Sequence, residues 1–185
     1  METTQTKTRW FWPWQDEKEE AWLGEMSANG WHLRSVGLIG RYTFEQGEPR
    51  SYTYRLDYML LNKDKRSEYL QIFRDAGWEY VSEMSNWQYW RKPAIAGETL
   101  EIFTDNESKI KKYQRLLLTM ALMLFILVFL GRNMFAGGLA FKDVSSVITT
   151  IYFIGQLLYA ILIPIYVVVV VKLAQRIRQL KKKAL

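Results

Sequence analysis

The chain of 185 residues contains no cysteine and one histidine. The absence of cysteine excludes disulfides, thiolate metal sites and cysteine nucleophiles, and it agrees with a reducing compartment. The histidine, His32, has no partner at metal-ligand spacing, so the sequence holds no zinc motif. A phosphate-binding glycine loop, a nucleophile elbow and an HExxH sequence are also missing. We therefore expect no metal, no cofactor and no catalytic residue, in a protein that is not an enzyme.

Acidic residues are scarce in one part of the chain. Residues 106–185 hold 2 Asp or Glu against 12 Lys or Arg, whereas residues 1–105 hold 17 against 13. The overall charge of +6 therefore comes from the C-terminal part, and the N-terminal part is acidic. Because an acidic balance disfavours phosphate, we expect no direct binding of nucleic acid.

Two stretches of the C-terminal part lack charged side chains. Residues 116–130 have one polar side chain, Thr119, and residues 147–171 carry no charge. A helix needs about 20 mostly apolar residues to cross a bilayer. The second stretch has that length by itself, and the first reaches it with its polar neighbours. We expect a hairpin of two membrane spans, at about 113–134 and 147–171.

Lysine and arginine precede the first span and follow the second. Basic residues close to a span resist translocation, so both termini are expected in the cytoplasm. The opening residues, METTQTKTRW, lack the apolar region of a signal peptide, which agrees with this orientation. The basic tail is also suited to anionic membrane lipids. The residues expected to contact lipid are Lys172, Arg176, Arg178, Lys181, Lys182 and Lys183.

The N-terminal part contains an internal repeat. A shift of 47 residues aligns EEAWLGEMSANGWHL with RSEYLQIFRDAGWEY without a gap, and it places Gly30 on Gly77 and Tyr42 on Tyr89. Matches of this kind indicate one supersecondary unit used twice. We assign the two copies to about residues 7–46 and 51–92, within a domain of residues 1–105.

Each copy is predicted to fold as strand, helix, strand, strand. Asp16 and Glu19 suggest a capping box that opens the first helix, and Gly30 suits its C-terminal end. The second helix is predicted over about residues 64–76, with Tyr69, Leu70, Ile72 and Phe73 inward. Strands are predicted over residues 7–12, 31–36, 41–45, 51–59, 78–83 and 87–92.

The predicted fold class is α+β. We expect one mostly antiparallel cytoplasmic sheet of about six strands, with two helices on one face. A juxtamembrane helix then begins at Asp105 or Asn106 and leads into the membrane hairpin of residues 106–185.

Several residues are candidates for a ligand or partner surface. Trp10, Trp12 and Trp14 alternate, so on a strand they would share one face and form a groove, a partner patch or a membrane contact. Arg55 and Asp57 also share a strand face, as a ligand-binding pair or an ordinary ion pair.

Other conspicuous residues have structural interpretations. Trp31 and Trp78 directly follow the two cap glycines, and we expect them in the core. The acidic run of residues 16–20 is interpreted as the usual preference for carboxylates at a helix N-terminus.

The sequence resembles a known bacterial family. FWPWQDEKEEAWLGEMSANGWHL, YTFEQGEPRSYTYRLDY, AGWEYV and NWQYWRKP follow in fixed order, and with EIFTDNESKIKKY they cover about residues 7–113. They resemble domain of unknown function 2812. The resemblance implies a membrane-attached protein, often encoded beside PadR-like transcriptional regulators. It implies no activity and no catalytic residues.

Three functional hypotheses follow. The leading one is a membrane-anchored, non-enzymatic regulatory or binding module whose cytoplasmic domain recognises a protein partner or a small ligand, with a role in envelope response. The alternative is an accessory or structural subunit of a membrane assembly or transporter, and a homo-oligomer stays open. The third, an enzyme using Asp57, Glu79 or His32, requires a deep polar pocket with perturbed titration.

Overall fold

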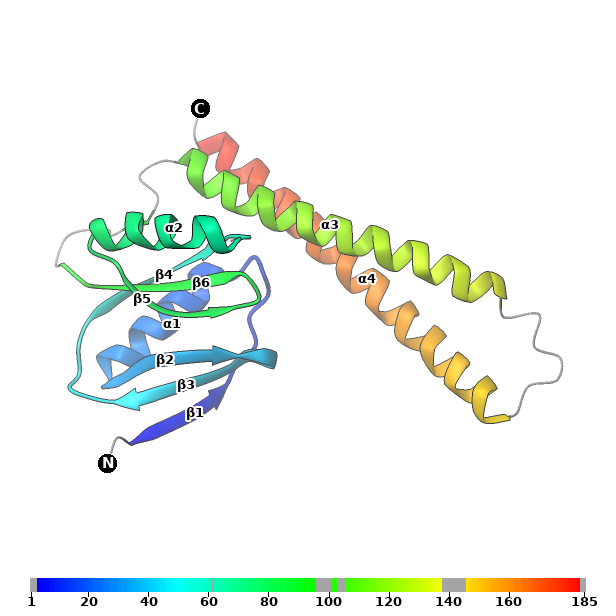
Figure 1. The fold of residues 1–185 in the computed structure, drawn as a ribbon, viewed down its shortest axis with the longest axis horizontal. Coiled ribbons are helices and arrows are strands. Elements are labelled where there is room, and N and C mark those ends of the chain that lie inside the picture. The colour runs from blue at the N-terminus through cyan, green and yellow to red at the C-terminus, as the bar shows by residue number, and fades with distance from the viewer. Residues whose placement is uncertain (1–2, 61, 96–100, 103–105, 138–145, 184–185) are drawn as a thin grey trace. The chain divides into compact units, whose positions relative to one another are not determined.

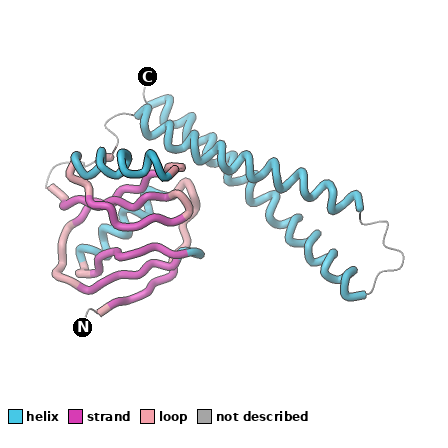
Figure 2. Tube along the Cα trace, viewed as in Figure 1, coloured by secondary structure: helices cyan, strands magenta, loops and turns pink. Residues whose placement is uncertain are grey.

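The structure is a computed structural model that describes residues 3–60, 62–95, 101–102, 106–137 and 146–183. It divides into two compact units, Met1–Lys112 and Tyr113–Lys183. The predicted fold class is confirmed, because the first unit combines helices with antiparallel sheets and two long apolar helices follow (Figures 1 and 2).

The first unit contains two copies of one strand–helix–strand–strand element. The first copy comprises β1 (Thr4–Thr8), α1 (Asp16–Ala28), β2 (Trp31–Gly37) and β3 (Arg41–Gln46), with a 3₁₀ turn over Leu38–Gly40. The second comprises β4 (Tyr52–Tyr58), α2 (Lys63–Asp75), β5 (Glu79–Met84) and β6 (Trp87–Pro93). In each copy the last strand occupies the middle of a three-stranded antiparallel sheet, in the orders β1-β3-β2 and β4-β6-β5.

Two backbone irregularities recur 47 residues apart. The chain leaves α1 through Gly30 (φ +79°) and α2 through Gly77 (φ +81°), both in the region that glycine favours. The register of β2 slips between Leu33 and Ser35, and that of β5 slips at the equivalent place. These shared details support the duplication that the sequence predicts.

The prediction of one six-stranded sheet is wrong, because the strands form two sheets. The sheets adjoin at β2 and β5, where the Val36 N–H donates to Ser82 Oγ over 3.1 Å. This contact uses a side chain, and no backbone ladder joins the two strands in the described part of the chain. The bulges in both strands add twist at this seam and oppose a continuous ladder.

The first strand also differs from its prediction. It covers Thr4–Thr8 instead of residues 7–12, because its partner β3 begins at Arg41, opposite Thr8. The next N–H, that of Arg9, donates to the carbonyl of Gly40 over 2.8 Å, and the chain then leaves the sheet. Trp10, Trp12 and Trp14 therefore lie in a loop and not on a strand face.

The predicted capping box is absent. The residue before α1 is Gln15, whose side chain makes no capping hydrogen bond, and Asp16 is already helical. The second helix is capped, since Asn62 Oδ1 accepts from the Lys65 N–H over 3.1 Å. The two helices thus begin differently despite the repeat.

The helices also pack differently. α1 contributes to a core shared by both sheets, in which Leu23, Phe44 and Leu56 are buried. α2 packs on the second sheet alone, over Trp78 and Trp90. The prediction for Trp78 is confirmed, Trp31 is only half-buried, and Ile72 is 60% exposed, contrary to its predicted inward position.

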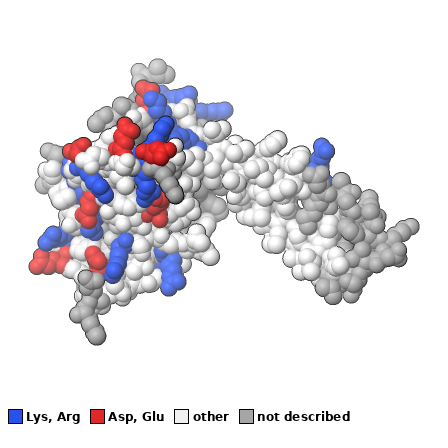
Figure 3. All heavy atoms as spheres, viewed as in Figure 1, with Lys and Arg blue, Asp and Glu red and all other residues white. Residues whose placement is uncertain are grey.

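The C-terminal part consists of α3 (Asn106–Gly137) and α4 (Ser146–Lys183). The stretches Glu107–Arg132 and Ile148–Lys182 are long and apolar enough to cross a membrane. Within the second unit, the Tyr159 hydroxyl of α4 donates to the Leu127 carbonyl of α3 over 2.7 Å. Phe125 and Leu157 remain more than 60% exposed, and Figure 3 shows almost no charge along the middle of these helices. Such apolar surface suits lipid better than water.

Candidate functional site

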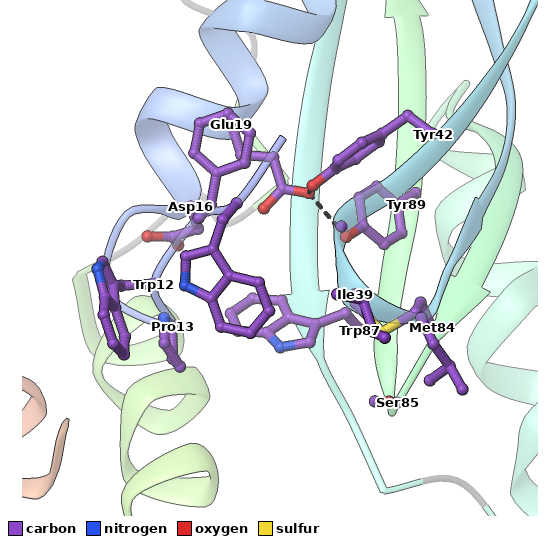
Figure 4. A pocket seen from close by; sticks show the side chains of 14 residues that line it. Trp12, Pro13, Asp16, Glu19, Ile39, Tyr42, Met84, Ser85, Trp87 and Tyr89 are labelled. Carbon is purple, nitrogen blue, oxygen red and sulfur yellow. Dashed lines mark hydrogen bonds between the residues drawn. The ribbon is translucent and has the colours of Figure 1, made fainter. Parts of the chain in front are cut away.

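A cavity of about 280 Å³ lies in the first unit. The loop after β1, the start of α1 and the two hairpin turns of the repeats surround it (Figure 4). Its volume is just below the range of about 300–1,000 Å³ that ligand pockets span. The lining residues are Trp10, Phe11, Trp12, Pro13, Asp16, Glu19, Leu38, Ile39, Gly40, Tyr42, Met84, Ser85, Trp87 and Tyr89.

Both repeats contribute to the cavity at equivalent positions. Tyr42 of β3 and Tyr89 of β6 are 47 residues apart, and both hydroxyls donate to the same oxygen, Glu19 Oε1, over 2.7 Å each. Leu38 and Ser85, also 47 residues apart, line it from the two hairpin turns. The cavity therefore lies where corresponding surfaces of the two copies meet.

Glu19 and its tyrosines form a buried polar cluster. Glu19 is 7% exposed, and burial raises its pKa, although the two tyrosyl hydrogen bonds lower it. Burial and the neighbouring Glu19 also raise the pKa of Tyr42 and Tyr89, so both remain neutral donors at physiological pH. The cluster presents one carboxyl group to an aromatic space.

The tryptophan loop forms the outer part of the cavity. Trp12 stacks on Trp14 with ring centroids 5.3 Å apart, and Trp10 meets Trp12 edge to face at 6.0 Å. Trp10 is 60% exposed. Of the predicted surface residues, Trp10 and Trp12 line the cavity, and Trp14 supports Trp12 from outside the lining.

The two hairpin turns that line the cavity hold unusual backbone conformations. Ile39, Ser85 and Asn86 have positive φ values of 59°, 49° and 69°. A positive φ is costly for a β-branched residue such as Ile39. Strain of this kind often accompanies binding sites, because function and not stability retains it.

The first turn of α1 also holds the edge of β4. The Leu56 N–H donates to Glu20 Oε1 over 2.8 Å, and the Leu56 carbonyl accepts from Lys112 Nζ over 3.1 Å. Lys112 Nζ also contacts Asp16 Oδ2 at 2.6 Å, with both side chains buried. Two side chains thus replace a neighbouring strand at Leu56. Sequence reasoning assigned these acids only to the helix N-terminus and missed their buried roles.

Glu20 is buried beside this contact. Desolvation raises its pKa to about 7, although Lys112 and Arg55 lower it and Asp16 raises it further. Arg55 Nη1 lies 3.3 Å from Glu20 Oε2, and its Nε lies 3.5 Å from Glu101. Arg55 therefore belongs to this structural cluster and not to the cavity lining.

Asp57 also lies away from the cavity. It is 1% exposed and accepts a hydrogen bond from the Tyr69 hydroxyl over 2.9 Å, on the side of the second sheet that α2 covers. The candidate surface predicted from sequence is thus divided, with Trp10 and Trp12 at the cavity and Arg55 and Asp57 elsewhere.

His32 has a structural environment. Its Nε2 donates to the Glu48 carbonyl over 2.8 Å, which in the neutral ring leaves Nδ1 to accept from Ser27 Oγ over 2.7 Å. Ser27 is fully buried and also contacts the Tyr54 hydroxyl at 3.1 Å. Within the described ranges, no group of His, Asp or Glu side chains is arranged to hold a metal ion.

The basic residues of the predicted tail lie along the end of α4. Lys172, Arg178, Lys181 and Lys182 are exposed, and the Arg176 guanidinium lies 5.9 Å from the Tyr113 ring centre within the second unit. The side chain of Lys183 lies outside the described residues.

The fold and the cavity define a duplicated α+β domain followed by two helices that are able to cross a membrane. The chain belongs to the family described as Protein of unknown function (DUF2812), whose model matches residues 15–126, more than half of the chain. The family expected from the sequence is confirmed. None of the curated proteins and none of the solved structures matches the chain.

Proposed function

We propose that this chain is a membrane-anchored, non-enzymatic regulatory module that binds a small ligand in the cavity between its repeats. The observation that carries the proposal is that Tyr42 and Tyr89, one from each repeat, both donate to Glu19 in the cavity. The indole rings of Trp10 and Trp12 line the same space and form its aromatic wall. Pockets that bind small molecules are mostly apolar and contain a few polar groups that orient the ligand.

The membrane arrangement supports this function. Two apolar helices anchor the chain, and basic residues before the first and after the second favour cytoplasmic termini. The first unit is then cytoplasmic, and a ligand reaches the cavity from inside the cell. The basic end of α4 contacts anionic lipid headgroups.

A binding role fits the cavity better than a catalytic one. Among the described residues, a serine–histidine hydrogen bond joins Ser27 to His32, but Ser27 is fully buried and neither residue lines the cavity. The carboxyl group of Glu19 is engaged by two tyrosyl hydroxyls instead of a nucleophile.

The regulatory part of the proposal rests on Lys112. This residue lies on α3, which continues into the apolar stretch, and its ammonium contacts Asp16, a lining residue of the cavity. A ligand that changes the position of Asp16 changes this ion pair. The α3 helix then senses occupation of the cavity.

The proposal is tested by calorimetric titration of the full-length protein in lipid nanodiscs with benzyl alcohol and with benzyltrimethylammonium. Trp10→Ala and Trp12→Ala, which reduce the aromatic wall, should weaken binding at least fivefold. Ile72→Ala removes an exposed apolar side chain outside the lining and should leave binding unchanged. If neither probe binds the wild type beyond empty nanodiscs, or if all three variants behave alike, the proposal is wrong.

An accessory subunit of a membrane assembly is the second candidate. Gln156 places an amide within the apolar part of α4, and such side chains form hydrogen bonds between membrane helices. Crosslinking in native membranes followed by mass spectrometry tests this candidate. A stoichiometric membrane partner that Gln156→Leu removes would favour it, whereas recovery of a PadR-like regulator would favour the regulatory module.

A further inference from the structure

The charge of the cavity lining is one-sided. Two carboxyl residues, Asp16 and Glu19, belong to a mostly apolar lining, and no lysine or arginine is among the described lining residues. Six aromatic side chains surround this space. They are Trp10, Phe11, Trp12, Tyr42, Trp87 and Tyr89.

The two carboxyl groups are in different states of pairing. Asp16 is compensated by Lys112 at 2.6 Å. Glu19 receives hydrogen bonds from two neutral donors among the described residues, and both of these tyrosyl hydroxyls use Oε1. Its Oε2 points away from both tyrosines (Figure 4). A buried carboxylate without a cation is costly, because its hydration is only partly replaced.

We propose that the cavity binds a small organic cation, with its ammonium group beside Glu19 and its apolar body against the indole rings. This inference rests on the binding function proposed above and names its ligand class. Aromatic faces attract cations through their quadrupole, and the carboxylate adds a full opposite charge. An anion would meet two carboxyl groups, whereas a neutral ligand could gain a hydrogen bond from Glu19 but no attraction between opposite charges.

One aromatic residue of the cavity lining, Phe11, already lies close to a cation. The Arg9 guanidinium lies 5.1 Å from the ring centres of both Phe11 and Trp22. Phe11 is a lining residue, whereas Arg9 is exposed and outside the lining. The chain thus shows that these rings accept a positive charge at cation–π distance.

The decisive experiment compares two benzyl compounds on the full-length protein in nanodiscs. Benzyltrimethylammonium carries a permanent charge and benzyl alcohol carries none. We expect the wild type to bind the cation at least tenfold more tightly. Glu19→Gln, which retains an acceptor for both tyrosines, should weaken cation binding at least tenfold and change benzyl alcohol binding less than twofold.

Glu20→Gln provides a matched control. It makes the same substitution of an amide for a carboxyl group one residue further along α1, but Glu20 holds Leu56 and does not line the cavity. Cation binding should change less than threefold. An equal loss in both variants would show that general electrostatics, and not a contact with Glu19, attracts the cation.

The outcomes separate this inference from the function on which it rests. If benzyl alcohol binds in the cavity and the cation binds no better, the binding function stands and the inference fails. If neither compound binds, both fail. If Glu19→Gln does not fold, Tyr89→Phe replaces it, because loss of this hydroxyl leaves Glu19 less fixed and should reduce the preference for the cation.

A pH series adds an independent measurement. Glu19 faces Tyr42 from β3, Tyr89 from β6 and Asp16 from its own helix, and burial raises its pKa. Protonation removes the charge that attracts the cation. Affinity for benzyltrimethylammonium should therefore fall with decreasing pH from above the usual glutamate range, while affinity for benzyl alcohol stays constant. Equal pH profiles for both compounds would contradict the inference.

Discussion

The two repeats share a scaffold but differ at the first turn of their helices. In the first copy this turn contains Glu19, which accepts from both equivalent tyrosines, Tyr42 and Tyr89. The position 47 residues later is Arg66, which pairs with Glu83 and Tyr80 on its own sheet. One copy thus directs this position into the cavity, and the other uses it for a local ion pair.

This difference shows how a duplicated fold gains a single site. Identical copies would present either two like charges or two local pairs, and neither gives one buried carboxyl group between the sheets. The first copy also places Asp16 where the second has Lys63, so its helix holds Lys112 of α3. The cavity and the link to α3 both depend on α1.

The largest effect should come from breaking the link to α3. Lys112→Met removes the cation that pairs with the buried Asp16 carboxylate, and breaking a buried ion pair costs about 3–5 kcal/mol of stability. Lys111→Met, at an exposed position beside Lys112, should cost less than about 0.5 kcal/mol. Thermal unfolding of the full-length protein in detergent, followed by near-UV circular dichroism, measures both.

A double variant checks this interpretation. Asp16→Asn with Lys112→Met removes both charges, so it should recover most of the lost stability. If the double variant is as unstable as Lys112→Met, the loss comes from the packing of the lysine stem and not from the ion pair.

Shortening a core side chain should cost more stability in α1 than in α2. Leu23 of α1 is fully buried, and Leu23→Ala should cost about 3–4 kcal/mol through lost burial and a cavity. The equivalent Leu70 of α2 is only half-buried, so Leu70→Ala should cost about 1–2 kcal/mol. Chemical denaturation of both variants compares them. Equal losses would contradict the unequal packing of the two helices.

Stability should depend on pH through the first copy. The pKa of Glu20 rises from 4.5 to about 7 on folding, so the folded chain holds this proton more tightly than the unfolded chain. The stability that this proton contributes to the fold is fully present below pH 4.5, and it is lost as the pH rises through about 7. The loss is about 3 kcal/mol, at about 1.36 kcal/mol for each pH unit.

Glu20→Gln isolates this titration, because glutamine does not ionise but keeps an acceptor for the Leu56 N–H. Unfolding free energies measured between pH 4.5 and 7.5 should show a smaller slope in the variant. An unchanged slope would assign the pH dependence to other groups.

The smallest predicted difference concerns the two cap glycines. Alanine is strained at both, but a Cβ at Gly30 would lie 2.7 Å from the Gly47 carbonyl oxygen, whereas at Gly77 it would meet the flexible Lys92 side chain at 3.2 Å. Gly77→Ala should cost about 1–2 kcal/mol, and Gly30→Ala about 1 kcal/mol more. Melting temperatures of the two variants provide the comparison. A greater loss at Gly77 would show that the backbone at Gly30 moves readily.

Much of the fold is predictable from the sequence because periodicity encodes it. The 47-residue repeat, the cap glycines and the apolar stretches follow from local patterns, and Tyr69 and Phe73 pack inward as predicted. The division into two sheets is different, because it depends on the twist at β2 and β5 and on which backbone edges meet. No local pattern specifies that choice.

The site was only partly predictable. Trp10 and Trp12 were recognised as surface candidates, but their predicted strand was wrong, because β3 ends the pairing at Thr8. Glu19 was missed, since carboxylates at a helix start are common on solvated surfaces. The repeat alignment could have pointed to Glu19. It matches Tyr42 to Tyr89, but it places Glu19 on Arg66, so the charge changes sign at one position of an otherwise similar helical turn.

The central claim is that both repeats enclose one ligand-binding cavity around Glu19. Fluorine NMR of the full-length protein labelled with 5-fluorotryptophan, titrated with benzyltrimethylammonium in nanodiscs, tests it most directly. We expect the resonances of Trp12 and Trp87 to shift, and those of Trp78 and Trp90 in the second core to stay unchanged. Shifts confined to Trp78 and Trp90, or no shift at any tryptophan, would contradict it.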